Sequence, residues 1–561
     1  MPDGVGTATA RWRRVLRAAL TLLAFLLVWA VLVLPERLFH LTPAGFLRIP
    51  LELLVLVGLA VLLPLRWTRV VAATAGVLLG LVTVVRIFDL GFHEALHRPF
   101  NPVEDWRLLP AAVDMLSESF GPGWADAAVI GAVLVVVLVP VAVTMSVIRV
   151  CRTAADRRRI SAGAAGSLGV VCLVCAVVGV QLTPGVPVAS RGATELAAVQ
   201  VRAAAHNLAD RSVFSRALAA DDPRKTVPAA ELLTGLRGKD VIFVFVESYG
   251  RVAVEGSSFS ADIQELLDAG TETLGAAGFS SRSAFLTSST FGGISWLAHA
   301  TLHSGLWVDS QQRHDQLLEI DRFTLPAAFE RAGWRTVVDV PSNRRPWPEG
   351  RAFYRFDEDY DRTDVGYEGP KFSFAAVPDQ YTLAAFERLE LGPGHAPVMA
   401  EIDLVSSHEP WTPLPRMLDW ADMGDGSVYD GMPAEGQAPT DVLGDAERIR
   451  GLYAASIQYS LTALISFVTT LHAQDENLVL VLIGDHQPAS VVTGPDASHD
   501  VPISIIAADP AVLEQTSSWG WYDGMLPGPD APVWRMDAFR DRFLTAFGPS
   551  PGGASTVAEP R

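Results

Sequence analysis

Acidic and histidine side chains stand at the ends of several apolar runs of the chain. They are Glu247 after the run 240–246, His408 after 397–405, Asp485 with His486 after 477–484, and His499 just before 502–507. Carboxylate oxygens and imidazole nitrogens together form binding sites for hard or borderline divalent metals. A lone glutamate is a weak signal, but an Asp-His pair directly after an apolar run is more specific. If the runs are neighbouring strands, these side chains predict a metal site.

A second chemical motif lies in the segment 291–305. Gly292 and Gly293 lead into a helix-like stretch in which Ser295 is the first polar residue. The start of a helix offers unpaired N–H groups and a partial positive charge, so it can hold an anion and favour an alkoxide. The alternative is an ordinary glycine-rich turn in which Ser295 only caps the helix.

His299 and His303 stand four residues apart on the same helix-like stretch. Two histidines at this spacing can share a zinc ion, but Ala300 occupies the position where a metalloprotease motif has glutamate. We expect one of the two to pack inside the fold and the other to line the pocket.

The elements that must position these groups are apolar runs alternating with helical patterns. Continuous apolar runs are typical of strands buried on both faces. Their alternation with helices predicts an α/β domain with a mainly parallel, doubly wound sheet. Ligands bind at the carboxyl ends of the strands in such sheets, where most of the polar residues described above occur.

The first third of the chain is different, because it contains five longer apolar runs. These runs are 18–34, 46–65, 70–85, 127–148 and 168–182. Each approaches the roughly 20 residues that cross a hydrocarbon core. We predict five transmembrane helices in residues 1–183, a linker with an amphipathic helix in 184–239, a catalytic domain in 240–545, and a flexible tail in 546–561. We do not expect the first run to be a cleaved signal peptide, because no small-x-small site precedes Pro35.

Arginine placement predicts the orientation in the membrane. Most arginines between the runs fall in segments that would be cytoplasmic if the N-terminus were inside, which favours that topology. Five crossings then place the large domain outside the cytoplasm. That domain has no cysteine, since Cys151, Cys172 and Cys175 all lie in or beside the apolar runs. The net charge of -18 argues against nucleic acid as a partner.

Together these motifs resemble the alkaline phosphatase and sulfatase superfamily, most closely the lipoteichoic acid synthases and phosphoethanolamine transferases. Glu247 at a strand end, the pair Asp485-His486 and the later His499 match the motifs of those proteins. Counting back ten residues from Gly305 puts the family's nucleophile at Ser295, with Ser288, Ser289 and Thr290 as local competitors. The resemblance implies one divalent metal ion (Mn²⁺ or Zn²⁺, with Mg²⁺ as a third option) held by Glu247, Ser295, Asp485 and His486. It implies substrate contacts for Arg345, Trp347, His408 and His499, the two histidines also being catalytic.

The function implied by this resemblance is transfer of a phospho-headgroup, such as phosphoglycerol, through a covalent phospho-Ser295 intermediate. The donor would be a membrane phospholipid and the acceptor an envelope glycolipid or polymer. The enzyme would be a multi-pass protein of the cell membrane with an extracytoplasmic catalytic domain. Two alternatives remain open: a sulfatase-like hydrolase of phosphate or sulfate esters, and a non-catalytic membrane protein with a degenerate domain. Serine in place of the usual threonine is a departure from the synthases and transferases.

Overall fold

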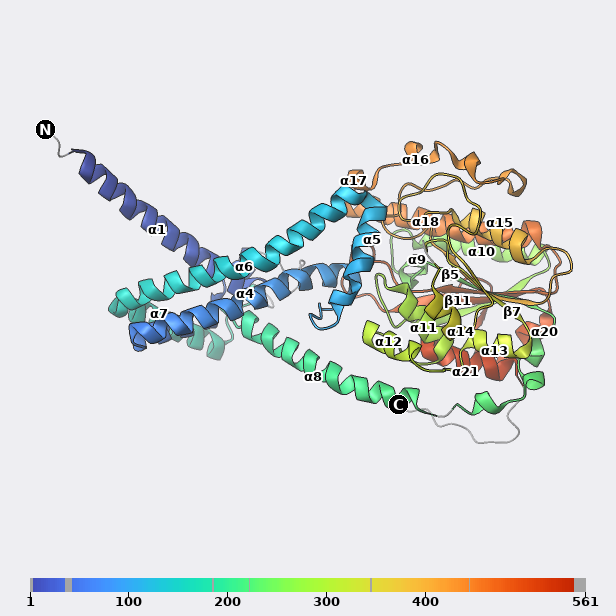
Figure 1. Ribbon diagram of the computed structural model, residues 1–561, viewed down its shortest axis with the longest axis horizontal. Coiled ribbons are helices and arrows are strands. Elements are labelled where there is room, and N and C mark those ends of the chain that lie inside the picture. Colours follow the sequence, from blue (N-terminus) through green and yellow to red (C-terminus); the bar gives the residue numbers. More distant parts are fainter. Residues whose placement is uncertain are drawn as a thin grey trace. The chain divides into compact units, whose positions relative to one another are not determined.

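The computed structural model describes residues 4–35, 43–183, 186–220, 222–343, 346–442 and 444–548 (Figure 1). The chain packs into two compact units. The first comprises Met1–Glu94, Arg98–Trp106 and Trp124–Ala209, and the second comprises Ala95–His97, Arg107–Gly123 and Asp210–Arg561. The division therefore runs inside the long helix α8 (Gly192–Leu218), in the region where the sequence predicts a linker helix. The predicted tail lies almost wholly outside the described residues.

Five apolar helices in the N-terminal region confirm the prediction made from the apolar runs. They are α1 (Gly4–Val33), α3 (Leu51–Leu62), α4 (Leu65–Leu96), α6 (Pro122–Asp156) and α7 (Arg158–Val178). All except α3 are long and apolar enough to cross a membrane, by length and composition. Where α4 and α6 meet, Gly76 and Gly80 let the backbones approach closely, because a Cβ on Gly80 would lie 2.5 Å from the Cα of Pro140.

The helix α3 is shorter than the run 46–65 that predicts it. Ile49 and Pro50 form the short strand β1 (Ile49–Pro50), which pairs with β4 (Ala189–Ser190), so the helix begins only at Leu51. It ends at Leu62, two residues before Pro64. The first unit also contains α2 (Pro43–Phe46), β2 (Gln181–Thr183) and β3 (Val186–Pro187).

The described part of the second unit is built on a nine-stranded sheet. The strands are β5 (Asp240–Val246), β6 (Ser280–Thr287), β7 (Arg335–Asp339), β8 (Glu358–Tyr360), β9 (Val398–Leu404), β10 (Leu478–Gly484), β11 (Asp500–Ala507), β12 (Tyr522–Asp523) and β13 (Val533–Arg535). Their order is β12-β6-β11-β10-β5-β9-β7-β8, with β13 paired to β6. The strands from β10 to β8 are parallel, as the sequence predicts, but β11 runs antiparallel to both β10 and β6. The sheet is therefore mixed.

The reversed direction of β11 matters for the site. In a parallel strand, His499 would stand at the amino edge of the sheet, away from the other predicted site residues. Because β11 is antiparallel to β10, its first residues lie beside the last residues of β10, with Ile503 opposite Ile483. His499 therefore reaches the same edge as Glu247 and Asp485.

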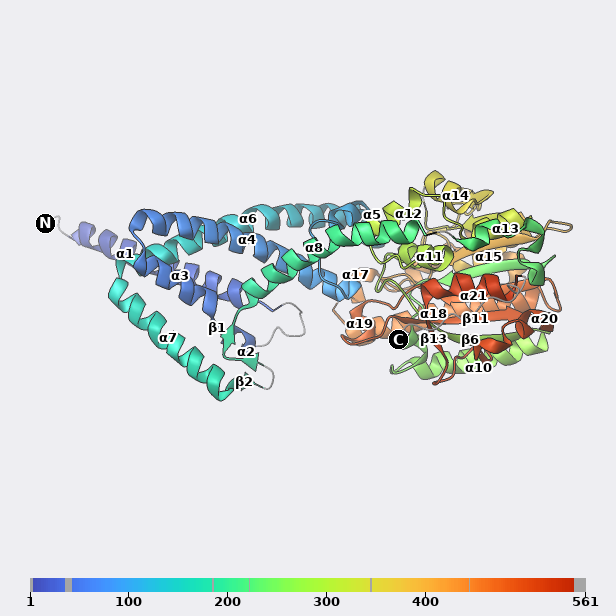
Figure 2. The same ribbon diagram turned by 90° about the horizontal axis from the view of Figure 1, so that it is seen from below.

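Helices cover both faces of the sheet (Figures 1 and 2). On one face lie α11 (Ser295–Ser304), α13 (Leu325–Ala332) and α21 (Phe539–Ala546), and on the other lie α10 (Ser260–Ala276), α15 (Asp379–Glu390) and α18 (Ala446–Ser466). Every residue of β5 and β10 is buried, because these central strands are covered on both sides. The remaining helices are α5 (Leu109–Phe120), α9 (Arg251–Val254), α12 (Gln311–Leu318), α14 (Pro348–Tyr354), α16 (Met432–Glu435), α17 (Pro439–Val442), α19 (Ser490–Thr493) and α20 (Pro510–Glu514).

The helix α18 also satisfies the length and hydropathy expected of a membrane span when the π turn at Phe467–Leu471 is included. Most of its apolar residues are nevertheless buried inside the second unit, where it packs against α10 and α15. It is therefore a core helix of the α/β domain.

Candidate metal centre

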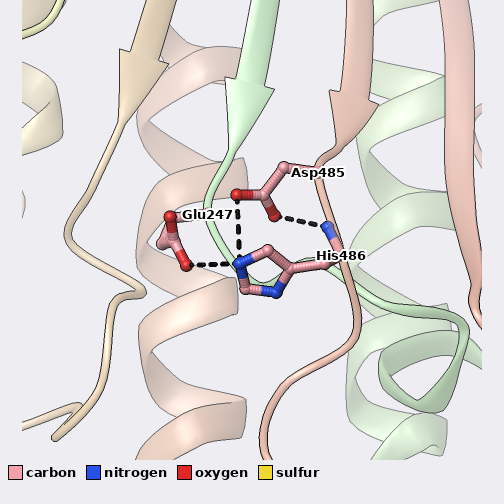
Figure 3. A group of neighbouring side chains, drawn as sticks. All are labelled: Glu247, Asp485 and His486. Atoms are coloured by element: carbon pink, nitrogen blue, oxygen red, sulfur yellow. Dashed lines mark hydrogen bonds and ion pairs between the residues drawn. The ribbon is translucent and has the colours of Figure 1, made fainter. Parts of the chain in front are cut away.

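The carboxyl edge of the sheet brings together three of the predicted metal ligands (Figure 3). Val246 pairs with Gly484, so Glu247 and Asp485 leave neighbouring parallel strands at the same level. The Nε2 atom of His486 lies 3.2 Å from Glu247 Oε1 and 3.5 Å from Asp485 Oδ2. All three residues are buried. Two carboxylates and an imidazole thus converge on one small volume.

Ser295 provides a fourth donor atom at the same place. Its Oγ donates to Glu247 Oε2 at 2.8 Å and lies 3.2 Å from His486 Nε2. It is the first residue of α11, which ends at Ser304 with Gly305 as its left-handed C-cap, as the sequence predicts. The capping alternative is wrong in detail: the N-cap is Ile294, and no side chain caps this helix. The Ser295 hydroxyl therefore faces the metal ligands.

Two strained backbone positions aim these groups. Ser248, directly after Glu247, has a φ of 58°, and Ile294, directly before Ser295, has a φ of 64°. A non-glycine residue in this left-handed region costs about 1–3 kcal/mol, and a β-branched residue such as isoleucine is a pronounced outlier there. Hydrogen bonds to and from the backbone hold the strained turns, since Gly292 N–H donates to Gln487 O at 2.8 Å and the side chain of Tyr453 donates from Oη to Ser248 O at 2.9 Å.

Asp485 is oriented by two backbone donors. Its Oδ1 atom accepts from the N–H of Ser248 at 2.8 Å and from that of His486 at 2.6 Å. The other oxygen, Oδ2, is the one that faces His486 Nε2. Ser248 also donates from Oγ to Glu247 Oε1 at 2.8 Å, so both carboxylates have fixed rotamers. The sequence analysis does not predict this role of Ser248. The one available signal was its position directly after Glu247, at the end of a strand.

The tautomer of His486 suits a metal ligand. Its Nδ1 lies 2.9 Å from the carbonyl oxygen of Gln487, which can only accept, so Nδ1 carries the proton. In the neutral ring, Nε2 then presents its lone pair to the carboxylates and Ser295. In metal sites, a backbone carbonyl commonly accepts from the ring nitrogen that does not bind the metal, which fixes the tautomer and the direction of the ring. The donor set of two carboxylates, one imidazole and one hydroxyl fits a single hard or borderline divalent cation.

The pKa shifts of the three ligands also indicate that this site requires a positive charge. Burial opposes ionisation of Glu247, yet His486 holds the pKa of that carboxyl well below its usual range. Burial and the neighbouring Glu247 raise the pKa of Asp485 to about 7. Burial alone would lower the pKa of His486, but Asp485 and Glu247 raise it to about 9. Without a metal, a proton on His486 therefore supplies the positive charge that the buried carboxylates require.

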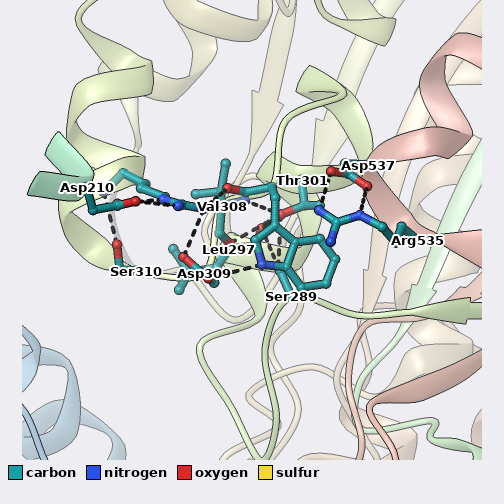
Figure 4. Close-up of polar contacts among 11 residues, drawn as sticks. Asp210, Ser289, Leu297, Thr301, Val308, Asp309, Ser310, Arg535 and Asp537 are labelled. Carbon is teal, nitrogen blue, oxygen red and sulfur yellow. Dashed lines mark hydrogen bonds and ion pairs between the residues drawn. The ribbon is translucent and has the colours of Figure 1, made fainter. Parts of the chain in front are cut away.

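The hydroxyls that compete with Ser295 point elsewhere. Thr290 Oγ1 donates to Gly293 O at 2.6 Å, and Ser288 Oγ donates to Asp485 O at 2.6 Å. Ser289 accepts from Thr301 Oγ1 at 2.8 Å and belongs to the contacts that tie the loop to α11 (Figure 4). Ser295 is therefore the one of the four whose hydroxyl contacts the side-chain atoms that would bind the metal, Glu247 Oε2 and His486 Nε2.

The two predicted catalytic histidines lie in the loops around this edge. The ring of His408 stacks on Phe374 with 3.5 Å between centroids, and its Nδ1 lies 2.6 Å from Glu409 O. Nδ1 is thus the protonated nitrogen and Nε2 the free one. Burial lowers the pKa of His408, against the charge of Glu247. The ring of His499 lies beside that of Phe291, with 5.2 Å between their centroids.

The two other predicted substrate contacts are Arg345 and Trp347. Arg345 lies outside the described residues. Trp347 stacks on His314 with 6.2 Å between ring centroids and packs against Gly350. The substrate-binding roles of Arg345 and Trp347 stay predictions.

Asp339 is a candidate functional residue that the sequence analysis misses. It ends β7, which places it at the same edge of the sheet, and it is fully buried. Neither carboxyl oxygen has a hydrogen-bond partner among the described residues. Burial, together with the charge of Asp403, raises its pKa well above the usual range. Its position at the end of an apolar strand was the available signal.

No protein-family model matches the chain, and no curated protein matches it. Among solved structures, the chain is similar to the lipoteichoic acid synthase LtaP from Listeria monocytogenes, with 16% identity, a TM-score of 0.38, and coverage of 57% of this chain and 74% of that chain. It is also similar to the phosphoglycerol transferase GacH from Streptococcus pyogenes, solved with sn-glycerol-1-phosphate, with 13% identity, a TM-score of 0.34, and coverage of 57% of this chain and 85% of that chain. A third similar structure is the soluble domain of lipooligosaccharide phosphoethanolamine transferase A from Neisseria meningitidis, with 10% identity, a TM-score of 0.35, and coverage of 57% of this chain and 93% of that chain.

Removing one charged ligand should empty this centre. We expect Asp485→Asn and Glu247→Gln each to weaken divalent-metal binding at the site by at least about 10- to 100-fold, the loss typical even of outer-shell changes. Elemental analysis of the purified full-length chain should then show about one ion fewer per molecule. Asp379→Asn is the matched control, because Asp379 is a fully buried carboxylate bonded to Ser406 and Ser460 instead. Wild-type metal content in Asp485→Asn would remove this residue from the ligand set.

Proposed function

We propose that this protein is a metal-dependent transferase of phospho-headgroups in which Ser295 is the nucleophile. The observation that carries the proposal is the position of the Ser295 Oγ atom, 2.8 Å from Glu247 Oε2 and 3.2 Å from His486 Nε2 at the start of a helix. A serine hydroxyl needs activation to attack phosphorus at neutral pH. Two features here would activate the hydroxyl by favouring its ionised form: the ligands for a divalent cation and the positive end of a helix dipole.

The reaction has two displacements at phosphorus. In the first, Ser295 Oγ bonds to the phosphorus of a phosphodiester donor, the bond from phosphorus to the lipid alcohol breaks, and the serine proton ends on that alcohol. In the second, the oxygen of an acceptor hydroxyl bonds to that phosphorus, the bond from phosphorus to Ser295 Oγ breaks, and the acceptor's proton ends on Ser295. When bound, a divalent cation would lower the pKa of the serine hydroxyl and offset charge on the phosphoryl oxygens.

His408 is the residue that we assign to proton transfer. Its Nδ1 faces the carbonyl oxygen of Glu409, so Nε2 is the nitrogen that can take a proton. Burial lowers its pKa, so the ring is neutral near pH 7 and can accept a proton from the acceptor hydroxyl. The reverse transfer would protonate the leaving alcohol in the first displacement. We assign His499, which lies at the same edge, to contacts with the non-reacting phosphoryl oxygens.

The donor that we propose is a membrane phospholipid such as phosphatidylglycerol, and the acceptor is an envelope glycolipid or polymer. The apolar helices α1, α4, α6 and α7 are long enough to cross a membrane and would keep the site beside a leaflet. The arginine bias assigns the catalytic domain to the extracytoplasmic side.

This topology can be tested with fusions to a reporter enzyme that is active only outside the cytoplasm. A fusion after Ala220 should be active, because the domain that follows is outside. A fusion after Arg158, the first residue of α7, should be inactive. The opposite pattern would place the catalytic domain in the cytoplasm and exclude an outer-leaflet donor.

The nucleophile is tested by substitution. Ser295→Ala should lower the turnover of a nitrophenyl phosphodiester on the order of several powers of ten, as expected for loss of a covalent nucleophile. Metal should stay bound, because Glu247, Asp485 and His486 remain. Ser295→Thr should be milder, since it keeps the hydroxyl on the same carbon.

Ser289→Ala is the matched control, because it removes a hydroxyl six residues away that bonds to Leu297 and Thr301 of α11 and not to the metal ligands. It should retain most activity. Near-normal turnover by Ser295→Ala, with its metal still bound, would reject Ser295 as the nucleophile.

A further inference from the structure

A second group of charged side chains lies in the core behind the metal centre. The helix α11 presents Ser295, His299 and His303 at intervals of four residues, so all three lie along one helix face. That face meets β9, whose Glu401 and Asp403 pair with Phe243 and Phe245 of β5. The neighbouring phenylalanines belong to the apolar core on the α11 side of the sheet. The two carboxylates are thus directed into an apolar layer.

Three donor atoms converge within this group. Nδ1 of His299 lies 2.9 Å from Glu401 Oε1 and 3.8 Å from Asp403 Oδ1. These ligand atoms all lie within 4.8 Å of one another, as metal ligands do. The His299 ring stacks on Phe245 with 3.9 Å between centroids and 16° between planes, which fixes the direction of Nδ1.

The charges of this group are only partly compensated. His303 Nε2 lies 2.6 Å from Glu401 Oε2, so that carboxylate has a contact on its other side as well. Asp403 is less well satisfied: its side chain is 15% exposed, but its Oδ1 atom is buried and has no hydrogen-bond partner among the described residues. The 3.8 Å between Oδ1 and His299 Nδ1 is an ion-pair distance and too long for a hydrogen bond. A buried carboxylate oxygen without a donor is costly unless a cation satisfies it.

We propose that His299 Nδ1, Glu401 Oε1 and Asp403 Oδ1 hold a second divalent cation, separate from the one at Glu247, Asp485 and His486. One imidazole and two carboxylates suit zinc or manganese. The ion satisfies Asp403 and links α11 to β9 one helical turn from Ser295. Its role is to position the helix, and it shares no ligand with the first centre. The proposal does not depend on the reaction assigned to Ser295.

Counting bound Zn²⁺ tests this proposal. The tag-free full-length protein in detergent is saturated with Zn²⁺, freed of excess by dialysis, and measured by elemental analysis. We expect two ions per chain in the wild type. We expect one ion in Asp403→Asn, one in Asp485→Asn, and close to none in the double variant, because the two sites have separate ligands.

Asp379→Asn is again the matched control. It removes a fully buried carboxylate that is hydrogen-bonded to Ser406 and Ser460 and belongs to neither donor group, so it should keep two ions. One ion in the wild type would overturn the proposal even if the variants failed to fold. Two ions in Asp403→Asn would also overturn it, because the second ion would then lie elsewhere. Neither result depends on turnover. A failure of the second metal site can therefore be told apart from a failure of the proposed transferase activity.

Discussion

Negative charge buried at the carboxyl edge of the sheet is the constraint on which the site depends. Glu247 and Asp485 follow strands that are buried along their whole length, so water cannot hydrate both carboxylates fully. Burying a charge in this way is costly unless hydrogen bonds or a cation compensate it. The surroundings supply both, in the two amide donors to Asp485 and the imidazole of His486. A hydroxyl held among these groups is placed for ionisation.

The same constraint accounts for the strained turns. Ser248 must turn sharply so that its N–H reaches Asp485 while Glu247 still faces the helix start. Ile294 must adopt a left-handed conformation so that Ser295 begins α11 with its hydroxyl towards Glu247. Strain of this kind persists when surrounding contacts hold it in place, and it clusters at functional sites. Here it frees the serine side chain from the capping role that an unstrained helix start would give it.

Much of this arrangement follows from local sequence patterns. The strands β5 and β10 are nearly continuous apolar runs, and β9 is apolar apart from Glu401 and Asp403. The segment between Gly292 and Gly305 marks the start and end of α11. The direction of β11 could not be predicted, because a strand's orientation is set by pairing with distant residues and not by its own composition. The strand β6 (Ser280–Thr287) was missed because its polar first half has no apolar run.

The contact between His299 and Glu401 is also hidden in the sequence. These residues are 102 positions apart, and their meeting depends on the register of β9 beside β5 and on the packing of α11 over both. Spacing alone suggested that His299 and His303 would share a ligand or divide between core and pocket. Both instead face Glu401 on the strand below, which only the tertiary structure brings to the helix.

The central claim is that one site performs two successive displacements through Ser295. The most direct test is the stereochemical course at phosphorus, followed with a phosphorothioate analogue of phosphatidylglycerol that is chiral at that atom. Each in-line displacement inverts the configuration. Two displacements through a phospho-serine therefore predict net retention in the product. Net inversion would contradict the account, because it would mean that the acceptor attacks the donor directly.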